Sequence, residues 1–212
     1  LLDGLAPSAV QAGAVNTVVN QEGQLIGHNT DGDGLVCSLL KDPDCAVAGH
    51  GVVLVGAGGA ARGALAALCR AGVKSVVVLN RTKAAAEELS DSFRLVFPNT
   101  LLHGAALDGQ SNCFLADADL LINATSLGMA GEKIDGLTLA LLPDHAKVYD
   151  MVYTPSITPL LLDARTRGLK AANGLGMLVA QGELAFTLWH GVTPEHDVME
   201  KALSSYFNAA KA

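Results

Sequence analysis

The sequence has little that would attract a charged polymer or enter a membrane. It has 14 Lys and Arg against 21 Asp and Glu, for a formal net charge of −7. Such a chain presents no positive field for nucleic acid or for an anionic bilayer. Its long uncharged runs, 4–21 and 45–61, are broken by Gly, Asn or Gln, so neither predicts a membrane span. We expect no nucleic-acid or membrane partner, and any anion must be bound by a local device.

Cysteine is also scarce. The four cysteines, at positions 37, 45, 69 and 113, are dispersed and have no metal-ligand spacing. The chain is not a small, cysteine-dense scaffold, so we expect free thiols in a reducing cytoplasm. The six histidines form no ligand pattern either, and no metal site is predicted.

Aromatic residues make up only 4% of the chain, whereas hydrophobic residues make up 50%. The core must therefore be built mainly from Ala, Val and Leu, and so large an apolar fraction argues against disorder. A length of 212 residues fits one large domain, or one complete domain and part of another.

Short apolar runs alternate with helical patterns along most of the chain. The run 52–55 has no polar residue, which is typical of a strand covered on both faces. The alternation predicts βαβ units, and hence an α/β fold with a Rossmann-type, doubly wound parallel sheet. Further strands are expected at 75–79, 119–123, 148–151 and 170–172, and helices at 83–93, 158–167 and from 177 to the end, the last helix being capped at 193–195.

The first forty residues have a different pattern. The β-prone segments 14–19 and 24–27 flank a turn signal at 20–23, which predicts a hairpin. The sequence Asn-Thr-Asp-Gly at 29–32 then offers side-chain caps for a helix.

A glycine-rich segment follows the apolar run. Gly56 and Gly58, with Ala61, match the pattern G-x-G-x-x-G/A between an expected strand and helix. Gly56 would permit a tight turn, Gly58 would let the backbone approach a pyrophosphate, and Ala61 would let the helix pack closely. The helix N-terminus would supply unpaired N–H groups to the anion. The alternative is a plain strand-to-helix turn.

The end of the next strand indicates which dinucleotide would bind. An NAD site would place a carboxylate there for the ribose 2′-OH, but the segment 80–83 reads Asn-Arg-Thr-Lys. Arg81 could stack on adenine and bond a 2′-phosphate, and Lys83 would add a point charge. NADP is therefore favoured as the cofactor. The alternative is that both are ordinary solvated residues at a helix start.

Seven strings in the same order and spacing resemble shikimate dehydrogenase across nearly the whole chain. They are Gly-Ala-Val-Asn-Thr at 13–17, Asn-Thr-Asp-Gly at 29–32, Gly-Ala-Gly-Gly-Ala at 56–60, Asn-Arg-Thr at 80–82, Asn-Ala-Thr-Ser at 123–126 with Gly-Met at 128–129, Asp-Met-Val-Tyr at 150–153, and Gly-Leu-Gly-Met-Leu-Val-Ala-Gln at 174–181.

The resemblance implies reversible, NADPH-dependent reduction of 3-dehydroshikimate to shikimate in aromatic amino-acid biosynthesis. It implies a remnant of an α/β substrate domain at 1–30, a Rossmann-type NADP domain at 31–175, and C-terminal helices at 176–212 that return to the substrate domain. The substrate would lie in the cleft between the two domains. A monomer or a homodimer is expected.

The resemblance also implies roles for individual residues. The expected substrate ligands are Asn16, Asp31, Tyr153 and Gln181, and Asp31 is also the expected catalytic residue. The expected cofactor surface is Gly56, Ala57, Gly58, Gly59, Ala60, Asn80, Arg81, Thr82, Met151 and Gly174, with Lys83 added from its charge.

Plainer roles are open for three of the expected substrate ligands. Asp31 could simply cap a helix. Gln181 could bond to nearby backbone instead of a ligand. Tyr153 could be a surface tyrosine packed near Pro155.

One part of the family's pattern is missing. In the family, a Lys in an Asn-Val-Thr-x-Pro-x-Lys motif handles the proton together with the Asp at the Asp31 position. That motif would precede the string at 13–17, and the sequence begins at Leu1 rather than Met. We therefore expect a fragment or processed chain that binds NADP but turns over slowly. The open alternatives are a non-catalytic NADP- or shikimate-binding module, a quinate-accepting dehydrogenase, and another NADP-dependent reductase.

Overall fold

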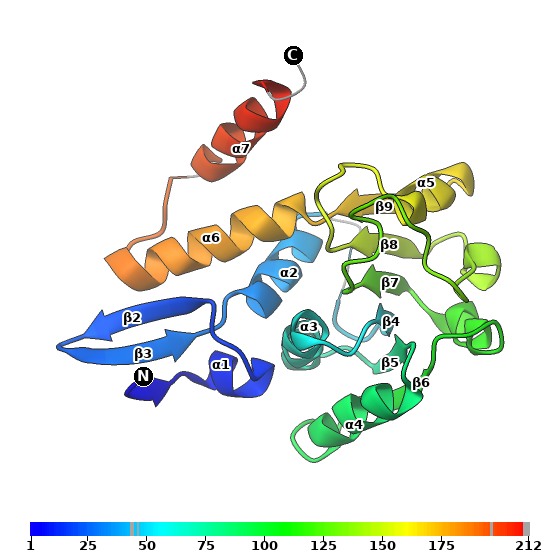
Figure 1. The fold of residues 1–212 in the computed structure, drawn as a ribbon, viewed down its shortest axis with the longest axis horizontal. Coiled ribbons are helices and arrows are strands. Elements are labelled where there is room, and N and C mark those ends of the chain that lie inside the picture. Colours follow the sequence, from blue (N-terminus) through cyan, green and yellow to red (C-terminus); the bar gives the residue numbers. More distant parts are fainter. Residues whose placement is uncertain (43–44, 46, 196, 210–212) are drawn as a thin grey trace.

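The computed structural model describes residues 1–42, 45, 47–195 and 197–209. It contains a six-stranded parallel sheet and a smaller three-stranded sheet (Figure 1). The strands of the larger sheet are β4 (Gly51–Val55), β5 (Ser75–Asn80), β6 (Leu101–Ala106), β7 (Leu120–Asn123), β8 (Lys147–Asp150) and β9 (Lys170–Asn173).

The larger sheet has the strand order β6-β5-β4-β7-β8-β9. This is the doubly wound order of a Rossmann fold, in which the chain reverses direction across the sheet next to its first strand. The reversal here lies between β4 and β7, and a crevice for a ligand is expected at the carboxyl ends of those strands. The expected α/β fold class is confirmed.

Both faces of the larger sheet are covered. All five residues of β4 are buried, and they alternate between two core layers, with Val52 and Leu54 in one and Val53 and Val55 in the other. The covering elements are α3 (Gly59–Arg70), α4 (Lys83–Arg94), α5 (Pro159–Thr166) and the 3₁₀ segments η1 (Ser111–Asp117) and η2 (Leu139–Leu141).

The smaller sheet contains the predicted hairpin. Its strands β2 (Thr17–Gln21) and β3 (Gln24–His28) are antiparallel. Glu22 and Gly23 turn the chain with positive φ angles of 53° and 92°. The short strand β1 (Gly4–Leu5) pairs in parallel with β3, and helix α1 (Pro7–Ala12) follows it. Neither β1 nor α1 was predicted.

Helix α2 (Asp31–Leu40) packs against both α3 and α6 (Leu175–His190), and so joins the two parts of the fold (Figure 1). Its glycines permit this close packing. A Cβ on Gly32 would lie 2.3 Å from the carbonyl oxygen of Gly63 in α3, and one on Gly34 would lie 2.8 Å from Cβ of Gln181 in α6.

Strand β6 was also not predicted, because His103 and Gly104 interrupt its apolar pattern. One prediction needs correction. The last helix was expected to begin at the 193–195 cap, but α7 (Val198–Ala209) begins a few residues later. Within the described ranges, no helix is both long enough and apolar enough to span a bilayer.

Candidate dinucleotide and substrate site

The glycine-rich turn joins β4 to α3 at the switch point of the sheet. Gly56 has a φ of +113°, and a Cβ there would lie 3.0 Å from Cγ2 of Thr125 and 3.2 Å from the carbonyl oxygen of Ala124. Only glycine adopts this backbone conformation without strain. The sequence-based reason for Gly56 is therefore confirmed: it permits the tight turn after β4.

Gly58 and Gly59 face open space. A Cβ on either residue would have nothing within 4 Å among the described atoms, so their missing side chains serve no internal packing. Gly58 is the N-cap of α3, and the first turn of that helix has neither a side-chain cap nor an acidic residue. Such a helix end binds anions. An open cleft lies beside it, lined in part by Ala57, Gly58, Gly59 and Arg62.

The segment 80–83 lies beside this turn, because β4 and β5 pair in parallel with Val55 opposite Leu79. The Asn80 amide donates to the Thr82 carbonyl oxygen at 3.0 Å, which shapes the loop. Arg81 and Thr82 are exposed, and the first turn of α4 has no acidic residue.

The two basic residues of this segment differ. Lys83 forms an i,i+4 ion pair with Glu87 at 3.3 Å, which fits the alternative of an ordinary helix-start residue. Arg81 forms no ion pair with any described residue, so its guanidinium is available for an anion.

A pocket of about 370 Å³ lies on the other side of the glycine-rich turn, at the carboxyl ends of β7 and β8. Met151 and the 40% exposed Tyr153 line it together with Ala60, so the structure brings three of the predicted residues together. The remaining lining residues are Ala124, Thr125, Ser126, Met129, Val152 and Thr154.

Gly174 lies against this pocket. It is the N-cap of α6, and a Cβ there would lie 2.0 Å from the carbonyl oxygen of Met151. Any larger residue would separate α6 from the loop after β8. The start of α6 is also held by the buried Tyr149, whose hydroxyl accepts from Met177 N at 3.2 Å and lies 2.9 Å from the Ser38 hydroxyl. Burial raises the pKa of this phenol, although both hydrogen bonds lower it.

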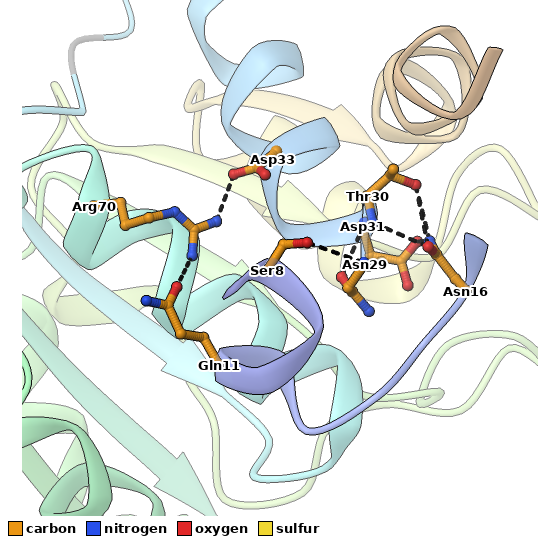
Figure 2. A network of polar contacts seen from close by, with 8 residues as sticks. All are labelled: Ser8, Gln11, Asn16, Asn29, Thr30, Asp31, Asp33 and Arg70. Carbon is orange, nitrogen blue, oxygen red and sulfur yellow. Dashed lines mark hydrogen bonds and ion pairs between the residues drawn. The ribbon is translucent and has the colours of Figure 1, made fainter. Parts of the chain in front are cut away.

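A polar cluster at the start of α2 joins two of the predicted substrate ligands, Asn16 and Asp31 (Figure 2). The Asn16 amide donates to the Asp31 carboxylate at 2.9 Å and to the Thr30 hydroxyl at 3.0 Å. The Asn16 side-chain oxygen accepts from Thr30 N at 3.0 Å. Asn16 lies in a bend before β2 rather than inside the strand, because its side chain turns to meet α2.

The plainer alternative for Asp31 is wrong, and that for Gln181 is partly right. Thr30, not Asp31, is the N-cap of α2, and the Thr30 side chain makes no capping hydrogen bond. The Gln181 amide donates to the Leu178 carbonyl oxygen at 2.9 Å, as the backbone alternative expected. Its oxygen lies 3.5 Å from the Thr30 hydroxyl, so α6 brings Gln181 to the edge of the cluster.

Sequence reasoning missed the residues that support this cluster. Thr30 is buried, with an exposed fraction of 3%. Asn29 N donates to the Ser8 hydroxyl at 3.1 Å, and the Asn29 side-chain oxygen accepts from Asp31 N at 3.2 Å (Figure 2). The run of polar residues at 29–31 was a signal, but it was interpreted only as a cap and a family string.

An ion pair beside this cluster ties α2 to α3. Arg70 bonds the Asp33 carboxylate at 2.5 Å and also donates to the Gln11 side-chain oxygen (Figure 2). Among the described residues, no group of three or more His, Cys, Asp or Glu could hold a metal ion. All four cysteines are free thiols.

Comparisons with known proteins show the family to which the chain belongs. Residues 40–130 match the family described as "Shikimate / quinate 5-dehydrogenase", and residues 174–203 match "Shikimate 5'-dehydrogenase C-terminal domain". The shikimate dehydrogenase (NADP(+)) of Geobacter sulfurreducens is 46% identical over 204 residues, which are 96% of this chain and 71% of that protein. The chain belongs to the shikimate dehydrogenase family.

Solved structures of the family have the same fold. The shikimate 5-dehydrogenase of Listeria monocytogenes, in complex with shikimate and NAD, gives a TM-score of 0.86 at 34% identity and covers 95% of this chain and 72% of its own. The Thermus thermophilus enzyme, in complex with NADP(H) and shikimate, gives 0.79 at 39% identity, with 95% and 71% covered. The expected Rossmann-type architecture is confirmed.

Proposed function

We propose that this chain is an oxidoreductase that interconverts shikimate and 3-dehydroshikimate with NADP. The observation that supports it best is that the packing of α2 on α3 and α6 brings two sets of groups into one fold. An open glycine-rich turn at the start of α3, with Arg81 on the next strand end, fits a nucleotide, and the cluster of Asn16, Asp31 and Gln181 at the start of α2 fits a polar substrate. The curated relatives with 46% and 44% identity are both named shikimate dehydrogenase (NADP(+)).

The residues at the turn fit a dinucleotide. The open faces of Gly58 and Gly59 leave room for a pyrophosphate beside the uncapped N-terminus of α3. Arg81 would hold a 2′-phosphate at the adenosine end, and Asn80 and Thr82 would form the loop around it. The nicotinamide end would then lie across the switch point, in the pocket of Met151 and Tyr153, beside Gly174. When bound, NADP supplies the hydride acceptor or donor.

The substrate cluster fits a polyhydroxylated carboxylic acid. Asn16 and Gln181 present amide groups from this cluster, and we assign the Tyr153 phenol, which lines the pocket after β8, to the same ligand. Thr30 and Asp31 already fix the orientation of the Asn16 amide, and a substrate hydroxyl that bonds it would replace one of these existing hydrogen bonds. We assign Asp31 to the C3 oxygen, where a carboxylate accepts the hydroxyl proton as C3 loses its hydride.

The division into domains follows the same arrangement. We propose that 31–175 form the NADP domain and that 1–30 and 176–212 contribute to the substrate side. The six-stranded sheet from Gly51 to Asn173 lies inside the first range. Helix α6 packs on β2, which supports its assignment to the substrate side, and its packing on α2 holds it to the NADP domain as well. A reducing cytoplasm is the compartment we propose, in keeping with the four free thiols.

Calorimetry and a turnover assay test the function together. NADP⁺ and shikimate are titrated separately into the chain, and NADP⁺ reduction is then followed with shikimate or quinate as substrate. We expect heat of binding for both ligands and NADPH formation with shikimate. Binding of both without turnover would favour a non-catalytic binding module, and faster turnover of quinate would favour a quinate dehydrogenase. No binding of NADP⁺ would refute the proposal.

A further inference from the structure

A buried pair of polar side chains lies directly beneath the pocket of Met151 and Tyr153. Asn123 ends β7 and Asp150 ends β8, and the two residues are opposite each other in the parallel pair. Both are fully buried, with exposed fractions of 0%. The Asn123 amide donates to Oδ1 of Asp150 at 2.9 Å. Buried polar groups that are not part of the regular sheet hydrogen bonding need a specific reason.

Asn123 fixes the loop after β7. Its amide also donates to the Leu127 carbonyl oxygen at 3.1 Å, and its oxygen accepts from N and Oγ1 of Thr125 at 3.0 and 2.7 Å. These bonds use both donors and both acceptor positions of the amide. The orientation of the amide is therefore determined, and with it the position of Thr125, which lines the pocket.

Asp150 fixes the loop after β8 and the start of α5. Besides Asn123, its Oδ1 accepts from Val152 N at 3.1 Å, and its Oδ2 accepts from the Thr158 hydroxyl at 2.5 Å. Thr158 is the N-cap of α5 and accepts from Leu161 N. Burial raises the pKa of Asp150, while its bonds from Thr158, Val152 and Asn123 lower it.

We propose that Asp150 is a positioning residue for the dehydrogenase reaction. Its carboxylate holds the Met151–Tyr153 loop directly and the Thr125 loop through Asn123, and so sets the shape of the pocket that receives the nicotinamide half of the cofactor. The inference rests on the proposed function. Asp150 itself does not line the pocket, so it acts through its neighbours.

The test compares two ligands that share the adenosine half. NADP⁺ reaches the pocket after β7 and β8, whereas adenosine 2′,5′-bisphosphate reaches only the Arg81 side. In Asp150→Ala, three donors lose their acceptor. We expect NADP⁺ affinity to fall by about tenfold or more, because the loops after β7 and β8 would no longer be held in the arrangement that receives the cofactor and binding would have to order them. Affinity for the bisphosphate should change by less than about twofold.

Conservative variants distinguish positioning from general loss of stability. Asp150→Asn keeps the Oδ1 acceptor for Asn123 and Val152 and should bind NADP⁺ within about threefold of the wild type. If Asp150→Ala does not fold, Thr158→Val removes the donor to Oδ2. It should weaken NADP⁺ selectively, while Thr158→Ser should not.

Asn112→Ala is the matched control. Asn112 is also buried and forms three side-chain hydrogen bonds, to Gly109, Gly136 and Thr138, but none of these residues lines the pocket. It should lower the melting temperature and leave both affinities unchanged.

Two results would overturn the inference while the wild type still binds NADP⁺. One is an equal loss of affinity for both ligands in Asp150→Ala, and the other is no loss for either. Failure of the wild type to bind NADP⁺ would overturn the proposed function as well.

Discussion

Two glycines in the same turn should respond to alanine in opposite ways. Gly56 has a φ of +113° and close neighbours, whereas Gly58 has an extended backbone with φ −86° and faces open space. Gly56→Ala should therefore damage the fold, and Gly58→Ala should damage NADP binding. The comparison separates the structural role of the motif from its role in binding a ligand.

The magnitude for Gly56→Ala comes from its backbone. A non-glycine residue in that region costs on the order of 1–3 kcal/mol, and the new Cβ would also lie 3.0 Å from Thr125 Cγ2. About 2 kcal/mol corresponds to a fall in melting temperature of roughly 4–8 °C for a chain of this size. Gly58→Ala loses only a favourable N-cap glycine and should cost less than about 1 kcal/mol.

NADP⁺ binding should show the opposite pattern from stability, with Gly58→Ala as the variant that loses affinity. A methyl group on Gly58 would occupy the space beside the N-terminus of α3 that we assign to the pyrophosphate, so NADP⁺ affinity should fall about tenfold or more. Thermal melts and calorimetry on both variants provide the test. An unchanged melting temperature for Gly56→Ala, or wild-type NADP⁺ affinity for Gly58→Ala, would refute the reasoning.

Two further changes test other residues of the site, and a third tests the stability contributed by Asp119, which precedes β7 and accepts from Gly51 N at the start of β4. Arg81→Ala should weaken NADP⁺ by about 1.5–3 kcal/mol, as for a lost hydrogen bond to a charged group, with little change for NAD⁺; equal loss for both in calorimetry would contradict it. Asp31→Asn should slow turnover by about 10²–10⁴-fold with NADP⁺ affinity unchanged; wild-type turnover would exclude Asp31 as the base. Burial raises the pKa of Asp119, but hydrogen bonds from Gly51 and His145 lower it by more. The folded pKa of Asp119 therefore lies below its ordinary value of 3.8. The Asp119 carboxylate therefore takes up a proton more readily in the unfolded chain than in the folded one. The stability that Asp119 contributes is present above pH 3.8, and it is lost as the pH falls through the lower folded pKa. Melts of Asp119→Asn and wild type should thus converge at acidic pH, and a constant difference would contradict the assignment.

Local patterns predicted the larger sheet and its first turn well. The run 52–55 had to be a strand buried on both faces, and Gly56 had to make a tight turn, because each follows from residue type and spacing alone. The edge strand β6 was not predicted, because its glycine and histidine leave no clear periodic pattern of apolar residues.

Contacts between distant segments were beyond the reach of local patterns. Nothing in the string at 29–32 says that Asn16 will bond Asp31, or that Gly174 will lie against Met151. Those residues were named through a family resemblance, and only the fold shows the distances between them. The pairing of Asn123 with Asp150 was hidden for the same reason, since it depends on the register of β7 and β8.

A crystal structure of the chain with NADP⁺ and shikimate bound would test the central claim most directly. We predict that the pyrophosphate will bond the backbone N–H groups between Ala57 and Ala60, and that the 2′-phosphate will contact Arg81. The C3 hydroxyl of shikimate should lie within hydrogen-bond distance of Asp31. A nucleotide bound away from the end of β4, or shikimate bound away from Asn16 and Asp31, would contradict the account.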